Sequence, residues 1–412
     1  MKTSTDYKRT KFACYSSYLS IAAAFMLTPL LFETFHDSYL ISYTLLGTLV
    51  LITFATQLAI DLVFSLFSKY FNLKVTAVLM PLFQSLGFVI YALVPLFFPN
   101  IAYLGLVLGT FVFSISAGLG EVLLSSIIAS IPSQTPDKDM SLLHSLYAYG
   151  SLFVITVSTL YLHFVGKEHW FYLALFWATL PLITCYLFIT SKLPPQKSGI
   201  ESQKERKRSN KAGFVLLFLC IFFGGATECT MSSWISSYAE SVFKFSKTLS
   251  DLLGMAMFAI FFGTGRTLYS KYGKNITRVL LCGMISSAFC YIVAALSQSD
   301  VISLIACALT GFCASLLWPG SLILMEEKQS GVGIGAYALM AAGGDLGASI
   351  APQLMGFVVD MVSASDILSS LSLPRDVVGM KAGMLISALF PIFGAAVVIL
   401  ITRYYKKNKK EI

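Results

Sequence analysis

The sequence predicts an all-α polytopic membrane protein with twelve transmembrane helices in two six-helix bundles. Three observations lead to this prediction: the composition, the recurrence of long apolar stretches, and the positions of the basic residues. Of the 412 residues, 56% are hydrophobic and only 12% are charged, whereas soluble domains carry roughly 25% charged residues. This balance excludes a water-soluble protein.

Apolar stretches long enough to cross a bilayer recur along the whole chain. Residues 214–225 and 384–401 are almost uniformly apolar, without the period-2 alternation of a barrel strand or a single polar helical face. A helix needs about 20 apolar residues to cross roughly 30 Å of hydrocarbon, because every backbone amide in lipid must be bonded internally. The spans are therefore expected at residues 12–34, 41–67, 75–98, 101–129, 142–164, 169–191, 213–239, 249–270, 276–297, 300–324, 334–359 and 380–403.

The basic residues are segregated to one side of this topology. Most of the 29 Lys and Arg residues fall in segments that are cytoplasmic if the N-terminus is inside. The positive-inside rule then places both termini in the cytoplasm and requires an even number of spans. The net charge of +8 is therefore a topology signal, and no nucleic-acid partner is expected.

One long polar stretch, residues 191–211, divides the spans six and six. It predicts an N-terminal bundle over residues 1–191, a cytoplasmic linker over 192–212 and a C-terminal bundle over 213–412. The eight cysteines fall within or at the ends of spans, where cysteine behaves as a small apolar residue, so no disulfide framework and no metal site are expected. The sequence has no Walker lysine motif, HExxH or GxSxG, so we expect neither an enzyme nor a cofactor.

The two halves also echo one another. Residues 67–70 (Phe-Ser-Lys-Tyr) and 269–272 (Tyr-Ser-Lys-Tyr) each follow the second span of their half. A parallel repeat of six spans is the arrangement of major facilitator transporters.

Five short motifs resemble the fucose permease-like (sugar/cation symporter) branch of the major facilitator superfamily. They are Gly118 to Glu121, Gly224 to Glu228 with Trp234 and Tyr238 after it, Gly265-Arg266 with Lys271 and Gly273, Gly311 to Gly320 with Trp318, and Gly343 to Gly347 with Pro352. The resemblance implies the major facilitator fold, a small-molecule substrate, and H⁺ or Na⁺ as the coupling cation. We expect a multi-pass protein of the inner or plasma membrane that acts as a monomer.

This sequence departs from that branch at three points. Phe71 stands where the first-half loop motif usually has a glycine, the first span lacks the acid that proton-coupled sugar members carry, and Ser125 stands where an asparagine is expected. The spans hold no asparagine and few glutamines, although sugar binding draws on amide side chains. A sugar-like solute and an amphiphilic or cationic solute therefore both remain open.

Charged side chains deep in a span are the candidates for ion coupling, because each costs roughly 2.5 to 3.5 kcal/mol on insertion scales. The candidates for carrying the proton or cation are four acids: Glu121, Glu228, Asp345 and Asp61. Glu121 is the first choice, because the small residues before it permit close helix approach or access to a cavity. A packing role is the alternative for Glu121, and capping of a kink is the alternative for Glu228.

Asp61 lies near the cytoplasmic end of its span, where a structural or gating bond is favoured over ion carriage. Arg266 is the one deep cation, and we expect it to neutralise an acid on a facing helix or in its own half.

Polar and aromatic side chains near these acids are candidates for the substrate cavity. They are Trp234, Trp318, Ser125, Ser232, Tyr147, His144 and Gln57. Gln57 precedes Asp61 by four residues and Ser232 follows Glu228 by four, so each shares a helix face with its acid. His144 is equally explained as an ordinary helix-end histidine.

These observations favour a secondary active transporter that moves a small organic solute by alternating access, in symport with a proton or sodium ion. A proton-coupled antiporter that exports a hydrophobic or cationic compound is the alternative with the same fold. A membrane sensor or scaffold that transports nothing is the alternative of another class.

Overall fold

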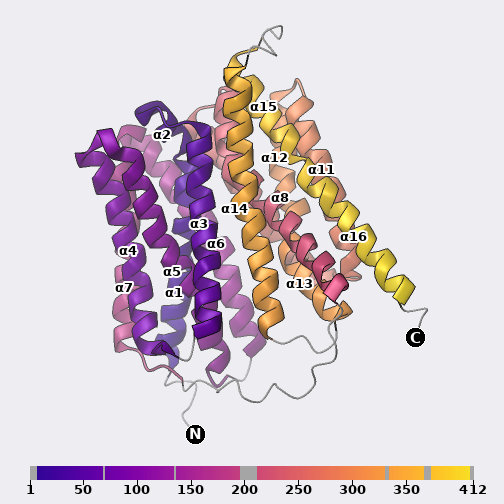
Figure 1. Ribbon diagram of the computed structural model, residues 1–412. Coiled ribbons are helices and arrows are strands. Elements are labelled where there is room, and N and C mark those ends of the chain that lie inside the picture. The colour runs from indigo at the N-terminus through magenta and orange to yellow at the C-terminus, as the bar shows by residue number, and fades with distance from the viewer. Residues whose placement is uncertain are drawn as a thin grey trace. The chain divides into compact units, whose positions relative to one another are not determined.

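Helices make up the regular structure of the chain (Figure 1). The computed structural model describes residues 7–67, 70–133, 136–194, 211–329, 334–365 and 373–408, and these residues contain no strand. Within them, 11 helical segments are long and apolar enough to cross a membrane, and Tyr149–Val165 is a shorter apolar helix. The predicted all-α polytopic class is confirmed. Most of the predicted linker, residues 195–210, lies outside the described residues.

The chain divides into two compact units. The first unit comprises Met1–Leu40 and Ile52–Glu201, and the second comprises Ile41–Leu51 and Ser202–Ile412. Residues 41–51 precede the predicted linker in sequence and nevertheless pack with the second unit. Each unit is described by itself below.

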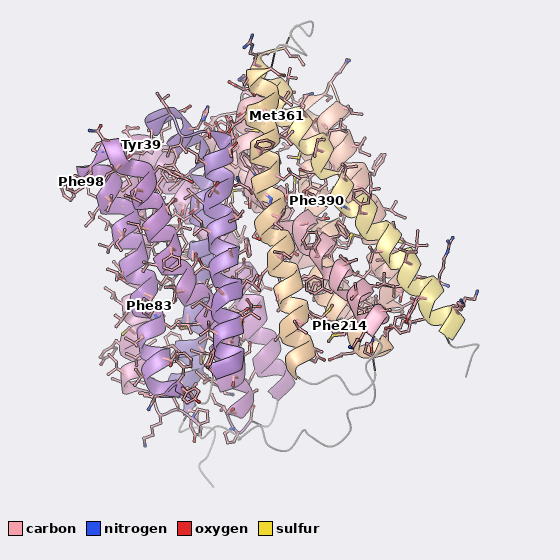
Figure 2. The ribbon with its side chains drawn as sticks, in the orientation of Figure 1. Tyr39, Phe83, Phe98, Phe214, Met361 and Phe390 are labelled. Carbon is pink, nitrogen blue, oxygen red and sulfur yellow. The ribbon has the colours of Figure 1, made fainter. Side chains whose placement is uncertain are left out.

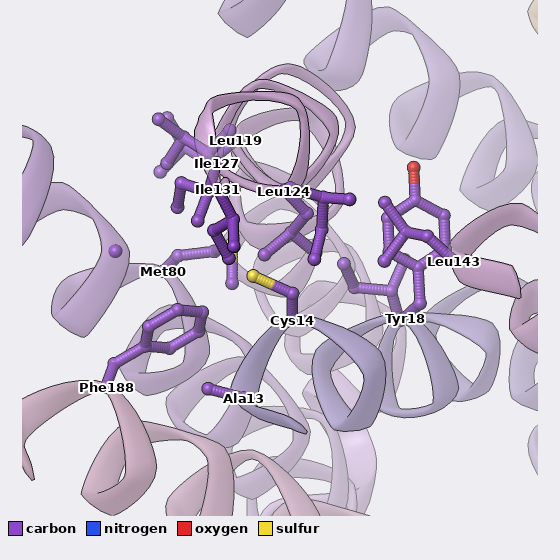
Figure 3. Packing of buried hydrophobic residues seen from close by; sticks show 14 of the residues in the cluster. Ala13, Cys14, Tyr18, Met80, Leu119, Leu124, Ile127, Ile131, Leu143 and Phe188 are labelled. Carbon is purple, nitrogen blue, oxygen red and sulfur yellow. The ribbon is translucent and has the colours of Figure 1, made fainter. Parts of the chain in front are cut away.

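The first unit is built around two long helices, α1 and α4, which make most of its packing contacts. Its elements are α1 (Lys8–Leu30), α2 (Phe32–Tyr39), most of α3 (Tyr43–Phe67), α4 (Leu73–Phe97), η3 (Pro99–Ile101), α5 (Ala102–Ser130), α6 (Pro136–Val165), η4 (Lys167–His169) and α7 (Trp170–Thr190). Helix α4 packs against α5 and α7, and α1 packs against α5, α6 and α7. Figure 3 shows the apolar cluster where these helices meet, with Cys14 and Met80 in its centre and the Tyr18 hydroxyl at its edge.

The second unit is built around α8 and α14. Its elements are α8 (Lys211–Phe243), α9 (Lys247–Leu249), the π-helical η5 (Ser250–Ala256), α10 (Met257–Tyr272), α11 (Ile276–Leu296), α12 (Asp300–Ala314), α13 (Leu317–Lys328), α14 (Ile334–Ala364), α15 (Arg375–Ser387) and α16 (Leu389–Asn408). Helix α8 packs against α14, α16 and α13, while α11 packs against α12 and α16. Glycines on α8 and α14 make the central contact, because a Cβ at Gly225 or Gly347 would meet the backbone of the facing helix.

Three predicted spans are interrupted. The span expected at 12–34 ends with α1 and continues as the separate helix α2, the span at 300–324 divides into α12 and α13, and the span at 380–403 divides into α15 and α16. Proline lies at each break: Pro29 in the last turn of α1, Pro319 as the third residue of α13 and Pro391 as the third residue of α16. Proline has no N–H to continue a helix but is tolerated in a first turn.

Large apolar side chains cover the outside of both units. Figure 2 shows Phe98 at the outer edge of the first unit, and the side chains of Phe98 and Met361 are 60% and 53% exposed. In water such a surface would favour aggregation, but in a bilayer it is the surface that the lipid tails contact.

One acid fixes the start of α3 within the second unit. The carboxylate of Asp360 on α14 accepts hydrogen bonds from the backbone N–H groups of Tyr43 (3.1 Å) and Thr44 (2.6 Å). The first N–H groups of a helix have no partner inside the helix, and a carboxylate at that point also suits the helix dipole. Gly356 adds to the contact, because a Cβ there would meet the carbonyl of Tyr43. Asp360 therefore explains why residues 41–51 belong to the second unit.

We expect Asp360→Ala to lower the free energy of unfolding by about 1 kcal/mol, which is the usual cost of losing a helix cap. Asp360→Asn keeps one acceptor and should cost less. Asp376, an exposed acid in the first turn of α15, is the matched control, because it caps no helix from another element among the described residues. Thermal unfolding of the purified variants measures the difference. Equal midpoints for D360A and D376A would contradict the capping role.

Candidate functional site

In the first unit, α3 and α5 bring three of the predicted site residues together. The amide nitrogen of Gln57 on α3 donates a hydrogen bond to Oε2 of Glu121 on α5. Asp61 lies one helical turn after Gln57 on the same face of α3, and the charge of Glu121 acts on it directly. We call Gln57, Asp61 and Glu121 the acid pair site.

Small residues on α5 allow this approach. A Cβ at Gly118 would lie 2.9 Å from the Cβ of Ile60 and 3.2 Å from the Cα of Gln57. Real Cβ atoms do not approach this closely, so any larger residue at position 118 would push α5 away from α3. A Cβ at Gly120 would likewise meet the Ile21 side chain on α1. The glycines before Glu121 thus hold its carboxylate within reach of the Gln57 amide.

Two oxygen atoms of the acid pair site lack a donor. Gln57 is 4% exposed, and its Oε1 atom and the Oδ1 atom of Asp61 are buried without a hydrogen-bond partner among the described residues. None of the ion pairs formed by the described residues includes Asp61 or Glu121. An unsatisfied buried polar atom costs about 1 to 3 kcal/mol. The site therefore offers oxygen atoms to a proton or cation and does not already contain a neutralising base within the described part of the chain.

The other candidates of the first unit are Ser125, Tyr147 and His144. The Tyr18 hydroxyl lies 3.5 Å from the Ser125 hydroxyl, one turn after Glu121. Tyr147 packs edge-on against Phe25 with ring centroids 5.8 Å apart. The side chain of His144 lies outside the described residues.

In the second unit, Glu228 and Arg266 face one another between α8 and α10. Nη2 of Arg266 lies 3.9 Å from Oε1 of Glu228, its Nε donates to the Ser315 carbonyl at 3.0 Å, and its Cζ lies 4.1 Å from the centroid of the Phe262 ring. The second carboxylate oxygen of Glu228 is buried without a hydrogen-bond partner among the described residues. Glu228 thus has a counter-charge, whereas the acid pair site has none among the described residues.

We expect Arg266→Gln to lower the free energy of unfolding by about 1 to 2 kcal/mol. Breaking a fully buried pair costs about 3 to 5 kcal/mol, and the effect here is smaller because the Arg266 side chain is 33% exposed and that of Glu228 is 17% exposed. Adding Glu228→Gln should restore part of the loss, since no unpaired charge then remains. Additive losses in a double-mutant cycle would show that the two charges do not interact.

The remaining second-unit candidates lie on α8, α13 and α14. Trp234 is fully buried, and its indole N–H donates to the carbonyl of Pro352 at 3.1 Å. Ser232 donates to the Cys229 carbonyl of its own helix at 3.3 Å. Trp318 lies against Gly225 and Gly344, where a Cβ would meet its ring. Asp345 is 1% exposed on α14.

Two further acids, Asp251 and Asp360, were not predicted from the sequence. Asp251 is fully buried in the π-helical turn η5, accepts a hydrogen bond from the Ser236 hydroxyl at 2.5 Å and pairs with Lys247 four residues before it. Both acids fall at the outer limits of their predicted spans, where a charged residue needs no special explanation. The i, i+4 spacing of Lys247 and Asp251 was the available signal for a pair.

A sequence comparison identifies the family. The model of the Major Facilitator Superfamily matches residues 13–352. The chain belongs to the Major Facilitator Superfamily. A member of this superfamily is a multi-pass membrane transporter and not an enzyme. No curated protein sequence matches the chain.

Solved structures of this superfamily share the fold at low sequence identity. An inward-facing, occupied bacterial homologue of the human lysosomal transporter Spinster has a TM-score of 0.77 and 13% identity, covering 98% of this chain and 98% of that one. A D-xylose–proton symporter has a TM-score of 0.73 and 16% identity, covering 94% and 97%. A mutant of the nucleoside transporter NupG has a TM-score of 0.71 and 13% identity, covering 95% and 99%.

Proposed function

We propose that this member of the superfamily is a secondary active transporter that moves a small organic solute by alternating access, in symport with a cation. The observation that carries the proposal is the acid pair site. Two carboxyl groups lie together between α3 and α5, one of them held by a buried amide, with no ion-pair partner among the described residues. Placing such groups in a membrane span is costly, and a coupling site is a function that requires them.

The proposed cation is a proton or a sodium ion, and Glu121 and Asp61 are its proposed carriers. A carboxyl group with no fixed counter-charge can alternate between a neutral and a charged form as the cation enters and leaves. Glu228 fits this role less well, because Arg266 already balances its charge. The D-xylose–proton symporter among the structures with this fold is a reason to test protons first.

The proposed substrate is a small sugar-like or amphiphilic solute. The five motifs that resemble the fucose permease-like branch support a sugar-like molecule. Among the glutamines of the spans, Gln84 exchanges hydrogen bonds with Ser20 (3.2 and 2.6 Å) and is 1% exposed, which leaves few amides for a polyol. This shortage supports a less polar molecule. A thermal-shift screen of the purified protein against sugars, amino acids, nucleosides and organic cations distinguishes the two, since a ligand that binds only the folded state raises the unfolding midpoint.

We propose a protein of the plasma or inner membrane, and the distribution of basic residues supports an orientation with both termini in the cytoplasm. Proteolysis of right-side-out and inside-out vesicles tests this orientation. In this proposed orientation, Asp61 lies toward the cytoplasmic end of α3.

Reconstituted vesicles test the transport function. With the solute identified in the screen, an inward proton or sodium gradient should drive its accumulation. Accumulation of the solute that is driven by an outward proton gradient would instead identify an antiporter. Tight binding with no flux in either direction would contradict transport and support a sensor.

A further inference from the structure

We propose that Gln57 is a positioning residue that places a single shared proton on Asp61 and leaves Glu121 ionised. The proposal deepens the proposed function, because it assigns the proton within the acid pair site, but its test does not require transport.

The geometry of the Gln57 amide carries the proposal. An amide side chain has one end that donates and one end that accepts. Its donor end points at Glu121, and a donated hydrogen bond favours the ionised form of a carboxyl group. Its acceptor end, Oε1, is buried and has no donor among the described residues. The amide therefore favours an ionised carboxyl group at its nitrogen end and a hydrogen-bond donor at its oxygen end.

Asp61 is placed to supply the missing donor. It follows Gln57 by four residues, so the two side chains are neighbours on one face of α3. The Oδ1 atom of Asp61 also has no partner among the described residues. If Asp61 were ionised, neither of these two unpartnered oxygen atoms could supply a hydrogen to the other. A proton on Asp61 turns its carboxyl group into a donor for the Gln57 Oε1 atom, and both orphan atoms are then satisfied.

The charges around the site require only one proton. Asp61 and Glu121 interact electrostatically, and two carboxylates in a poorly hydrated site do not readily ionise together. Among the described residues of the packed helices, Tyr18 of α1 also interacts with Glu121 and with Cys14, whereas Lys11 and Asp139 are paired with one another. No Lys or Arg among the described residues forms an ion pair with either acid. One proton removes the repulsion between the two carboxylates. The Gln57 amide favours Asp61 as the residue that carries this proton.

A proton fits this site better than a metal cation. The described residues contain no group of three His, Cys, Asp or Glu side chains that could hold a metal ion. Sodium would also have to replace most of its hydration shell with oxygen atoms, and the acid pair site provides only two carboxyl groups and one amide oxygen. The experiment below nevertheless includes sodium as an outcome.

Infrared spectroscopy of the protein in lipid vesicles near neutral pH locates the proton, because a protonated carboxyl group has its own C=O absorption. In the wild-type background we expect Asp61→Asn to remove a protonated-carboxyl band and Glu121→Gln to retain it. In a Gln57→Met background the assignment should reverse. Glu121 then loses the donor that favoured its ionised form, and Asp61 loses the acceptor that favoured its protonated form. Glu121→Gln should now remove the band and Asp61→Asn should retain it.

Gln84→Met is the matched control, because Gln84 is an equally buried glutamine of the first unit whose amide contacts Ser20 instead of an acid. The band should stay on Asp61 in that background. A band that remains on Asp61 after Gln57→Met would overturn the positioning role. A band that Glu121→Gln removes and Asp61→Asn retains in the wild-type background, or one that sodium abolishes at constant ionic strength, would overturn the placement of the proton. Vesicles that show the reversal but no flux would contradict the proposed function alone.

Discussion

Glu121→Gln is expected to abolish gradient-driven accumulation of the solute while leaving exchange across the membrane intact. Glutamine keeps an oxygen that accepts the hydrogen bond from the Gln57 amide, so the contact between α3 and α5 should survive. It carries no charge, however, so the repulsion between the two acids that makes the site hold one shared proton is lost. Internal solute should then rise only to the external concentration. Uptake into vesicles with and without an imposed pH gradient measures both quantities.

Glu168→Gln provides the control for this variant. Glu168 is an exposed acid in the short η4 turn, and its loss should leave accumulation unchanged. If Glu121→Gln vesicles still concentrate the solute to the wild-type level, Glu121 is not part of the coupling site. If the variant loses exchange as well, Glu121 is needed to move or bind the solute and not only to couple it.

Gly347→Ala is expected to have the largest effect on stability. A Cβ at this position would meet the carbonyl of Phe222, and its distance from the backbone nitrogen of Ala226 would be 3.0 Å. These are backbone atoms of α8, which cannot swing aside as a side chain can. Helices α8 and α14 would have to separate along the centre of the second unit. Overpacking of this kind typically costs about 1 to 3 kcal/mol and occasionally more, and we expect a loss at the upper end of this range.

Gly263→Ala is the matched control, since a Cβ at Gly263 on α10 meets nothing within 4 Å. Alanine is a better helix former than glycine by about 1 kcal/mol, so this variant should be neutral or more stable. Thermal unfolding and the yield of monodisperse protein compare the two. Equal unfolding midpoints would show that α8 and α14 do not pack through Gly347 as described.

The sequence was sufficient for the class of fold because lipid imposes it. A chain with 56% hydrophobic residues and repeated apolar stretches of about 20 residues has no other way to satisfy its backbone in a bilayer. The breaks within spans were harder to predict, because proline can lie inside a helix or in its first turn. Pro319 and Pro391 each lie in a first turn, and hydropathy does not distinguish these cases.

The individual residues of the candidate site could be predicted from the sequence, but the contacts between them could not. Glu121 stood out because a charge in a span demands an explanation, and Gln57 shares a helix face with Asp61. That the Gln57 amide reaches across to Glu121 on another helix depends on how α3 and α5 pack, which Gly118 permits but does not specify. For Trp234, the cavity role that its motif suggested stays a prediction. The bond from its N–H to the Pro352 carbonyl, in a fully buried position, depends on how α8 packs against α14 and could not be predicted from the sequence.

The central claim is that the carboxyl groups of the first unit take up a proton each time the solute crosses. Recording internal and external pH while the solute enters vesicles that lack any imposed gradient tests this claim most directly. The wild-type protein should carry protons inward with the solute, and Glu121→Gln should move the solute with no change in pH. Solute entry by the wild-type protein that leaves the pH unchanged would contradict the account.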